Sequence, residues 1–349
     1  MPKLRFLARS LEGNRGMRQR NQAIDVLRFV ATLAIFNHLA APFYGRYAMF
    51  ATGGAIGCVI FFFCSGYLVA CAGGGDGGFL SWLKRKICRL WPTCFIAVLF
   101  YEVFCGLHFE KSGGGVAYAL KGAGWFVPCI VAHYVAWWWI CFKARVNRLV
   151  VFAVDIFVSI AFMYVFVPLD SPGLVLFGGV NTYFKWLFTF MFFLLGVIIA
   201  EREHNLRIRP GIDAIMMVVC LALFYSLYPI AAKSMALTRI QFVEWFPLMG
   251  FAYYAYKVAN AGFVLRMFGS KWFSYIVWFV GGLSLEMYLV GGSSFVRHRW
   301  TQYPYPYGYM IGLVTAFVCA YFVRSAGRLL AQTFDRSRVS YDWRAIFKP

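Results

Sequence analysis

Long runs of apolar residues, separated by short polar and basic segments, dominate the chain. A helix needs roughly 20 such residues to cross a hydrocarbon core of about 30 Å. The runs therefore predict ten membrane-spanning helices, at approximately 24–44, 53–72, 92–109, 125–142, 148–168, 184–201, 212–230, 240–257, 272–292 and 306–326. The 240–257 span has the weakest pattern, because Glu244, Pro247 and Gly250 interrupt it. The predicted fold class is an all-α, polytopic membrane protein.

The basic residues between these runs indicate an orientation. If the N-terminus is inside, the inner segments and their helix boundaries hold 25 Lys and Arg residues, the outer segments hold 8, and the last of the 34 is Arg28 in the first span. Cytoplasmic loops carry such an excess, so both termini are predicted to be cytoplasmic. The chain then divides into a basic N-tail (1–22), a membrane domain (23–326) and a basic C-tail (327–349).

Composition supports a membrane protein and argues against a nucleic-acid partner and a bound metal. The chain is 61% hydrophobic and 14% charged, whereas soluble domains have about 25% charged residues. The net charge of +20 is explained by topology and by attraction to anionic membrane lipid. We expect no nucleic-acid partner, because the interleaved stacking pattern is missing. The ten cysteines show no metal-ligand spacing, so no metal is expected.

Two ionisable residues in the first span are the strongest candidates for chemistry. Arg28 lies near its start and His38 ten residues later, which is about 15 Å along a helix. Such residues are costly in a bilayer and usually face a polar cavity. We predict His38, well inside the membrane, as a base or acyl relay, and Arg28 as facing a cytoplasmic pore. The alternatives are a satisfied structural histidine and a local Asp25–Arg28 ion pair.

A cationic segment precedes the third span. Its residues, FLSWLKRKICRLWP at 79–92, have the spacing of an interfacial amphipathic helix that ends at Pro92. Lys86 and Arg89 share a helix face, and Arg85 lies beside them. These cations are either topogenic and bound to lipid headgroups, or a clamp for a phosphorylated cytosolic substrate.

Four further positions in or beside spans are candidates for substrate contact. Ser65 or Tyr67 in the second span could donate a hydrogen bond to substrate, although small residues there also suit helix packing. Glu286 in the ninth span needs a partner; it could orient His38 or contact an acceptor, or it could pair with a structural cation or stay protonated. Trp125 could line an acceptor entrance, although it also fits an aromatic belt. His133 is interpreted as packing or cavity lining.

Four sequence blocks together resemble the acyltransferase-3 family of integral membrane acyltransferases. The blocks are DVLRFVATLAIFNH, GGAIGCVIFFFCSGYL, KRKICRLWP and LSLEMYLVGG, with GWFV at 124–127 as a weaker fifth. The matching positions are Asp25, Leu27, Arg28 and His38; Gly54, Gly57, Phe61, Phe62, Ser65, Gly66 and Leu68; Lys86, Arg89 and Pro92; and Ser284, Tyr288 and Leu289. The chain departs from the family pattern at Lys86, where arginine is usual, and at Gly291, where histidine is frequent.

The resemblance implies an enzyme that takes an acyl group, usually acetyl, from cytosolic acyl-CoA and transfers it to a hydroxyl group. The acceptor would be a glycan or lipid-linked saccharide of the cell envelope or an exopolysaccharide. The implied location is the bacterial inner membrane, with polysaccharide assembly machinery as a possible partner. In this interpretation His38, Arg28 and Glu286 are catalytic, and Glu286 is a candidate substitute for the histidine replaced by Gly291.

The same interpretation assigns the binding roles. Arg85, Lys86 and Arg89 bind acyl-CoA, while the four residues that contact substrate are Ser65, Tyr67, Trp125 and Tyr288. The main competing hypothesis is a transporter or flippase for a glycan or small anion, in which Arg28 and His38 form a proton relay. A third hypothesis is a non-catalytic membrane scaffold, in which Arg28, His38 and Glu286 would tolerate neutral substitution.

Overall fold

Helices make up every regular element that the structure describes. The computed structural model describes residues 21–74, 78–106, 123–169, 173, 177, 182–231, 233–293, 296, 299–333 and 342–347. Its helices, in order, are α2 (Gln22–Leu39), α3 (Ala41–Tyr44), η1 (Gly45–Phe50), α4 (Gly54–Ala72), α5 (Gly78–Cys105), α7 (Phe126–Ala136), η2 (Trp137–Lys143), α8 (Arg148–Phe166), α9 (Thr182–Arg202), η3 (Glu203–Asn205), α10 (Pro210–Ala231), α11 (Met235–Arg239), η4 (Gln241–Glu244), α12 (Trp245–Ala259), α13 (Gly262–Phe268), α14 (Lys271–Gly282), α15 (Ser284–Gly291), α17 (Tyr307–Thr333) and α18 (Trp343–Phe347). The predicted all-α class is confirmed.

Membrane-spanning length is reached by seven single helices within the described ranges. Two bent pairs, α2 with α3 and η1 (64°) and α14 with α15 (54°), raise the number to nine. The span expected at 240–257 is divided between η4 and α12, and α12 has 15 residues, about 22 Å of helix. It is therefore shorter than the hydrocarbon core that a span must cross.

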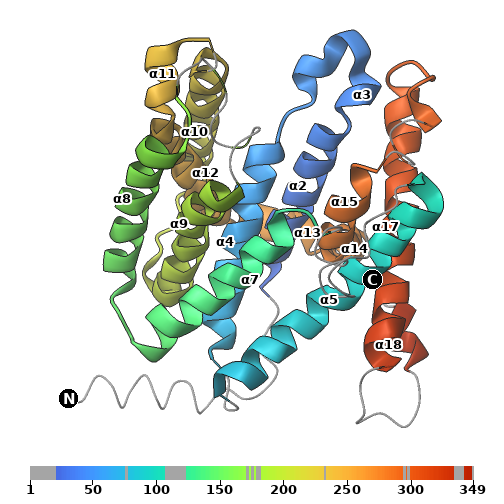
Figure 1. The fold of residues 1–349 in the computed structure, drawn as a ribbon, viewed down its shortest axis with the longest axis horizontal. Coiled ribbons are helices and arrows are strands. Elements are labelled where there is room, and N and C mark those ends of the chain that lie inside the picture. Colours follow the sequence, from blue (N-terminus) through green and yellow to red (C-terminus); the bar gives the residue numbers. More distant parts are fainter. Residues whose placement is uncertain are drawn as a thin grey trace.

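The molecule has two recognisable ends (Figure 1). α3 and α11 lie at the upper end of this view, whereas α4 meets α5 at the lower end. We refer to the lower end as the inner end and the upper one as the outer end, following the orientation predicted from the loop charges. Residues 1–20 of the predicted N-tail, and 334–341, 348 and 349 of the predicted C-tail, lie outside the described residues.

The prediction that the cationic helix ends at Pro92 is wrong. α5 continues without a break from Gly78 to Cys105, with Pro92 inside it. Proline is tolerated within membrane helices because neighbouring groups satisfy the backbone carbonyl that it frees. The cationic segment and the third span are consequently one helix, which places Lys86 in direct continuity with the membrane segment.

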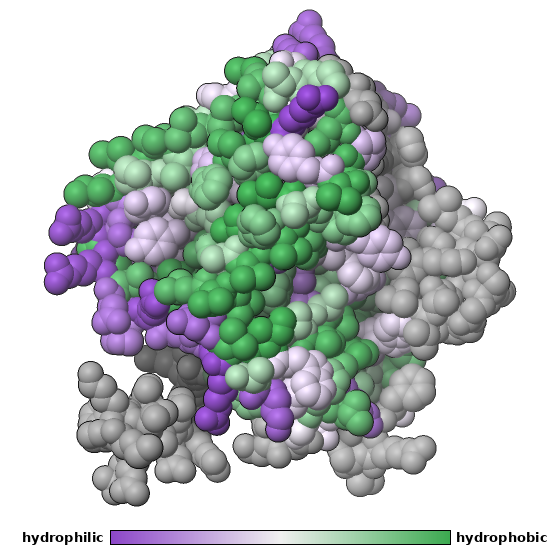
Figure 2. Space-filling model, turned by 60° about the vertical axis from the view of Figure 1, so that its left-hand side comes forward, coloured by the Kyte–Doolittle hydropathy of each residue, from purple (hydrophilic) through white to green (hydrophobic). Residues whose placement is uncertain are grey.

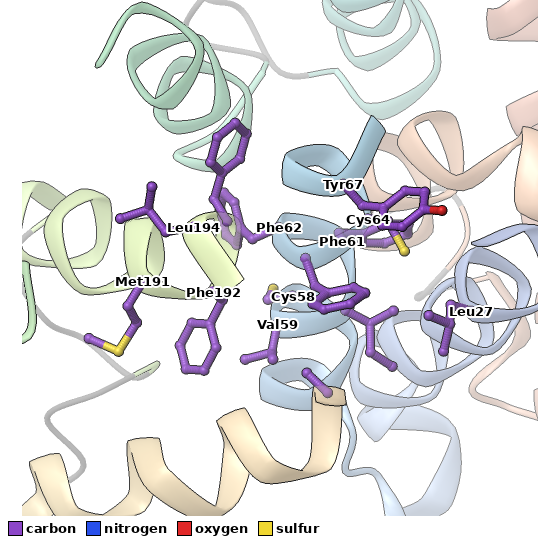
Figure 3. Close-up of a cluster of buried hydrophobic side chains, with 14 of the residues drawn as sticks. Leu27, Cys58, Val59, Phe61, Phe62, Cys64, Tyr67, Met191, Phe192 and Leu194 are labelled. Atoms are coloured by element: carbon purple, nitrogen blue, oxygen red, sulfur yellow. The ribbon is translucent and has the colours of Figure 1, made fainter. Parts of the chain in front are cut away.

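α4 forms the centre of the packing, between α9 on one side and α2 on the other (Figure 3). Gly66 lies directly against the backbone carbonyl of Phe193, and Gly196 lies in the same way against that of Phe63. Any side chain at either glycine would overlap this backbone. The two glycines thus let α4 and α9 approach closely, as small residues do in other membrane bundles.

The lateral surface of the bundle, which runs between its two ends, is apolar. Large hydrophobic side chains on α8 and α10 are exposed, including Phe157 (73%), Val165 (70%) and Ile215 (64%). Figure 2 shows a broad hydrophobic surface, with hydrophilic residues gathered toward its margins. A soluble protein rarely exposes a patch of this kind, so lipid is the environment that this surface requires.

Candidate active site

Two cavities inside the bundle contain most of the residues singled out by sequence. The inner cavity has a volume of about 210 Å³, and its polar lining consists of Arg28, Ser65, Lys86, Tyr134, Ser284 and Tyr288. The outer cavity has a volume of about 560 Å³, and its lining includes His38, Thr52, Trp125, Tyr225, Tyr228 and Tyr288. Tyr288 is common to both, so the two cavities meet at its side chain.

α2 carries the two candidate residues that were predicted from the first span. The helix is unbroken from Gln22 to Leu39, and the Asn21 side chain accepts hydrogen bonds from the first-turn amides. Ten residues separate Arg28 from His38, which corresponds to about 15 Å along the axis and about 80° around it. One helix therefore supplies a cation to the inner cavity and an imidazole to the outer cavity.

Arg28 is fixed by a contact with the C-terminal half of the chain. Its Nη2 donates a hydrogen bond of 3.1 Å to the Ser284 hydroxyl, which lies at the first residue of α15. Arg28 also lines a third cavity of about 600 Å³ near the inner end, together with Asp25, Tyr67 and Glu203. We call this the mouth cavity. Arg28 thus lines two cavities, the inner cavity and the mouth cavity.

Lys86 is the member of the cationic segment that lines the inner cavity. Its Nζ lies 5.6 Å from the ring centroid of Trp82 and 5.3 Å from that of Tyr134. Cation–π contacts of this kind hold an ammonium in place without neutralising it. Arg85 and Arg89 are exposed on the same helix; neither of them lines the inner cavity, so they are placed to act only outside it.

His38 lies in the last turn of α2, and its side chain is exposed to the outer cavity. The chain bends by 64° directly after this helix, so His38 lies beside the bend. No described residue hydrogen-bonds to the imidazole, which argues against a satisfied structural histidine. A Cβ atom at Gly54 would lie 2.6 Å from His38 Cδ2, so the glycine provides the space that the imidazole occupies.

Tyr288 separates the two cavities. Its ring lies 5.3 Å from that of Phe126, centroid to centroid. A Cβ atom at Gly124, where φ is +59°, would lie 3.0 Å from the Tyr288 hydroxyl. The glycine therefore leaves space beside this hydroxyl. Tyr288 therefore faces any group that passes from one cavity to the other.

Glu286 does not lie beside His38. Its Oε2 is 4.0 Å from Nη1 of Arg324 on α17, and both side chains are largely buried. Arg324 also donates a hydrogen bond to the carbonyl of Gly282, where α14 ends. Of the interpretations given above, the structure matches pairing with a structural cation. This pair holds the bend between α14 and α15, and with it Ser284 and Tyr288.

The surroundings of Gly291 do not support Glu286 as a substitute for the histidine that is frequent at this position in the family. A Cβ atom at Gly291 would lie 3.4 Å from Leu39 and 3.5 Å from Phe36, that is, against the last turn of α2. A side chain at this position would adjoin the residues next to His38, whereas Glu286 faces Arg324. Residues 286 and 291 therefore have different neighbours.

Ser65 and Tyr67 separate into different environments although they are two residues apart. Ser65 lines the inner cavity. Tyr67 lines the mouth cavity and donates a hydrogen bond of 2.8 Å to Glu203. Tyr256 donates to the same carboxylate at 2.6 Å, so the Tyr67 hydroxyl is part of a network that ties α4 to α12 and η3.

His133 packs rather than lines a cavity, in agreement with one part of its interpretation. It is 3% exposed, its Nε2 lies 2.7 Å from the Trp186 carbonyl oxygen, and the rings of Phe62, Phe190 and Phe193 surround it. In the described part of the chain, no three His, Cys, Asp or Glu side chains are grouped as metal ligands would be.

Several site residues escaped sequence reasoning. Tyr134, Tyr225 and Tyr228 are tyrosines within apolar runs and have no motif to mark them. Arg324 falls near the end of the predicted span 306–326, but α17 continues to Thr333 and Arg324 is largely buried. Its position inside the predicted span is the sequence signal that indicates burial.

Comparison with protein families identifies the architecture. A family model described as an acyltransferase domain, that of acyltransferase-3, matches residues 21–329. The chain belongs to the acyltransferase-3 family. The match covers α2 through most of α17. It therefore includes both cavities, the helices α2, α5 and α15 that supply Arg28, Lys86 and Tyr288, and Trp125 at the N-cap of α7. No curated protein and no solved structure matches the chain.

Proposed function

We propose that this acyltransferase moves an acyl group, in the first instance acetyl, from cytosolic acyl-CoA to a hydroxyl of a glycan or lipid-linked saccharide. The observation that carries the proposal is the meeting of two cavities at Tyr288, one holding Arg28 and Lys86 and the other holding His38. An anionic donor and a hydroxylic acceptor can approach from opposite ends and meet at this residue.

The donor side fits the inner cavities. Acyl-CoA consists of a phosphorylated nucleotide and a long, narrow arm that ends in the thioester. An inner cavity of about 210 Å³ is too small for the nucleotide and suits the arm. Arg28 and Lys86 lie where phosphate or amide groups of the donor would pass, and cations of this kind bind phosphate oxygens strongly. Arg85 and Arg89, exposed at the inner end, are assigned to the nucleotide.

The acceptor side fits the outer cavity. His38 takes the proton from the attacking hydroxyl, whose oxygen forms a bond to the thioester carbonyl carbon while the C–S bond breaks. The imidazolium then returns its proton to the CoA thiolate. In the relay alternative the imidazole nitrogen bonds to the acyl carbon and displaces the CoA thiolate. The acceptor hydroxyl oxygen then takes the acyl group as the bond between nitrogen and acyl carbon breaks, and the hydroxyl proton goes to the thiolate. The Tyr288 hydroxyl donates a hydrogen bond to the carbonyl oxygen as negative charge develops there.

The wider setting follows from the same proposal. The acceptor belongs to the cell envelope or an exopolysaccharide, the protein resides in a bacterial inner membrane, and polysaccharide assembly machinery is its partner. Support comes from the apolar outer surface of the bundle (Figure 2) and from an outer cavity with several aromatic side chains that suit sugar rings.

An assay with labelled acetyl-CoA tests the proposal. Purified protein in detergent or nanodiscs should release CoA and either hydrolyse or transfer the label, and the His38→Ala variant should lose this activity at unchanged thermal stability. A transporter or flippase would instead move its substrate across proteoliposomes without consuming acetyl-CoA. Folded wild-type protein that leaves acetyl-CoA intact would refute the enzyme proposal.

A further inference from the structure

A hydrogen bond joins two walls of the outer cavity. Thr52, in the segment before α4, and Tyr225, on α10, both line this cavity, and the Thr52 hydroxyl donates to the Tyr225 hydroxyl at 2.5 Å. α4 packs on α2 and α9, whereas α10 packs on α12, and α10 lies apart from α3 at the upper end of Figure 1. The two hydroxyl groups therefore connect separate parts of the bundle. We call their contact the hydroxyl bridge.

The position of Thr52 is fixed from the last turn of α2. The side-chain nitrogen of Asn37 donates hydrogen bonds of 2.8 Å to the Phe50 carbonyl and 2.9 Å to the Thr52 carbonyl. Its side-chain oxygen accepts a hydrogen bond of 2.6 Å from the Tyr44 hydroxyl on α3. Because Asn37 directly precedes His38 in the chain, the same turn of α2 holds the imidazole and the α4 side of the bridge.

The bridge lies close to His38 and outward of the point where the two cavities meet. Gly54, the first residue of α4, lies against the His38 ring, and Thr52 precedes it by two residues. Tyr288 lines both cavities and so marks the inner side of the outer cavity. A thioester that reaches Tyr288 from the inner cavity would therefore have His38 and the bridge on its outward side.

We propose that the hydroxyl bridge makes the enzyme select a saccharide over water as the acyl acceptor. This inference depends on the proposed function. Water can attack a thioester as a sugar hydroxyl does: its oxygen bonds to the acyl carbon, the C–S bond breaks, and one proton passes through His38 to the thiolate, which gives acetic acid and CoA. Thr52 and Tyr225 are thus specificity determinants, because they control which hydroxyl compound reaches the thioester.

A sugar can open the bridge at low cost, whereas water cannot hold it open. Thr52 and Tyr225 lose one hydrogen bond when they separate, and the hydroxyl groups of a saccharide can bond to both. A saccharide also stacks on the rings of Trp125 and Tyr228 in the same cavity, so its binding energy drives the change, as in induced fit. Water makes no such additional contacts. The intact bridge therefore keeps bulk water from the thioester and limits its hydrolysis.

Hydrolysis in the absence of any sugar tests the bridge, because water itself is then the probe. Thr52→Val and Tyr225→Phe keep the shape of each side chain and remove its hydroxyl. Each should raise the His38-dependent release of CoA from acetyl-CoA by about three- to tenfold, a factor that corresponds to one hydrogen bond. Thr52→Ser, which keeps a hydroxyl, should hydrolyse at close to the wild-type rate. The double variant should exceed neither single variant, because both remove the same contact.

The direction of the change separates the bridge from a general structural role. A weakened fold lowers the rate, whereas an opened cavity raises it, and acetyl-CoA binding at the inner end should stay unchanged in both bridge variants. Tyr164→Phe is the matched control: the Tyr164 hydroxyl donates a hydrogen bond of 2.8 Å to the Arg239 carbonyl, and Tyr164 lines neither cavity. Its loss should leave hydrolysis unchanged.

The two proposals fail in different ways. If the wild type releases CoA in a His38-dependent reaction but Thr52→Val and Tyr225→Phe leave hydrolysis unchanged or lower it, the bridge proposal is overturned and the acyltransferase proposal stands. An equal rise in Tyr164→Phe, or a rise that persists when His38→Ala is added, would overturn it as well. If neither the wild type nor either bridge variant shows His38-dependent CoA release, both proposals are overturned.

Discussion

Adding one methyl group at Gly54 should inactivate the enzyme by displacing His38. The new Cβ atom would lie 2.6 Å from Cδ2, 2.7 Å from Cγ and 3.2 Å from Cβ of His38, whereas carbon atoms in contact prefer about 3.5–4.0 Å. Rotation of the ring alone cannot relieve overlap with Cγ, so the whole imidazole must move by about 1 Å. A displacement of that size costs about 100-fold in rate when a catalytic group is positioned precisely.

The assay compares Gly54→Ala with the wild type for CoA release and for thermal stability. Stability should change little, because His38 faces an open cavity into which it can move. Gly262→Ala is the control, since its Cβ atom would meet nothing within 4 Å. In the His38→Ala background, Gly54→Ala should have no further effect on rate. A Gly54→Ala enzyme with wild-type activity would refute the assignment of His38 to the reaction.

Three other substitutions test the surrounding structure. Gly66→Ala should destabilise the bundle by about 3 kcal/mol or more, because the overlap is with the Phe193 backbone and cannot be relieved by a rotamer change; an unchanged unfolding midpoint would contradict the close packing of α4 on α9. Glu286→Ala should cost about 3 kcal/mol by leaving Arg324 unpaired, measured by thermal unfolding, and the double variant Glu286→Leu with Arg324→Met should regain most of this loss. Ser284→Ala should raise the KM for acetyl-CoA by about tenfold with a smaller change in kcat, because Arg28 loses its hydrogen-bonded anchor; equal changes in KM and kcat would remove that role.

The first helix and the packing of the second were predictable from sequence because their signals are local. An arginine and a histidine within an apolar run imply a polar space, and the structure supplies a cavity for each. Gly66 lies at a position where small residues commonly bring helices together, and it does so here. Both inferences need only helical periodicity and the energetics of burial.

The partners of charged residues were not predictable, because they come from segments far apart in the chain. Glu286 could equally have faced His38 or a cation, and only the bend after α14 places it against Arg324. Pro92 suggested a helix end on local grounds, yet it is accommodated inside α5. The contact between Lys185 and Trp125 likewise depends on the approach of α9 to the start of α7, for which the sequence contains no periodic signal.

Donor binding and proton transfer are assigned to two different cavities, to which α2 contributes Arg28 and His38. Equilibrium binding of acetyl-CoA to the wild type, Arg28→Gln and His38→Ala separates the two assignments. His38→Ala should bind acetyl-CoA with near wild-type affinity although it does not turn over, whereas Arg28→Gln should bind at least about tenfold more weakly. Loss of binding in His38→Ala together with unchanged affinity in Arg28→Gln would contradict the account.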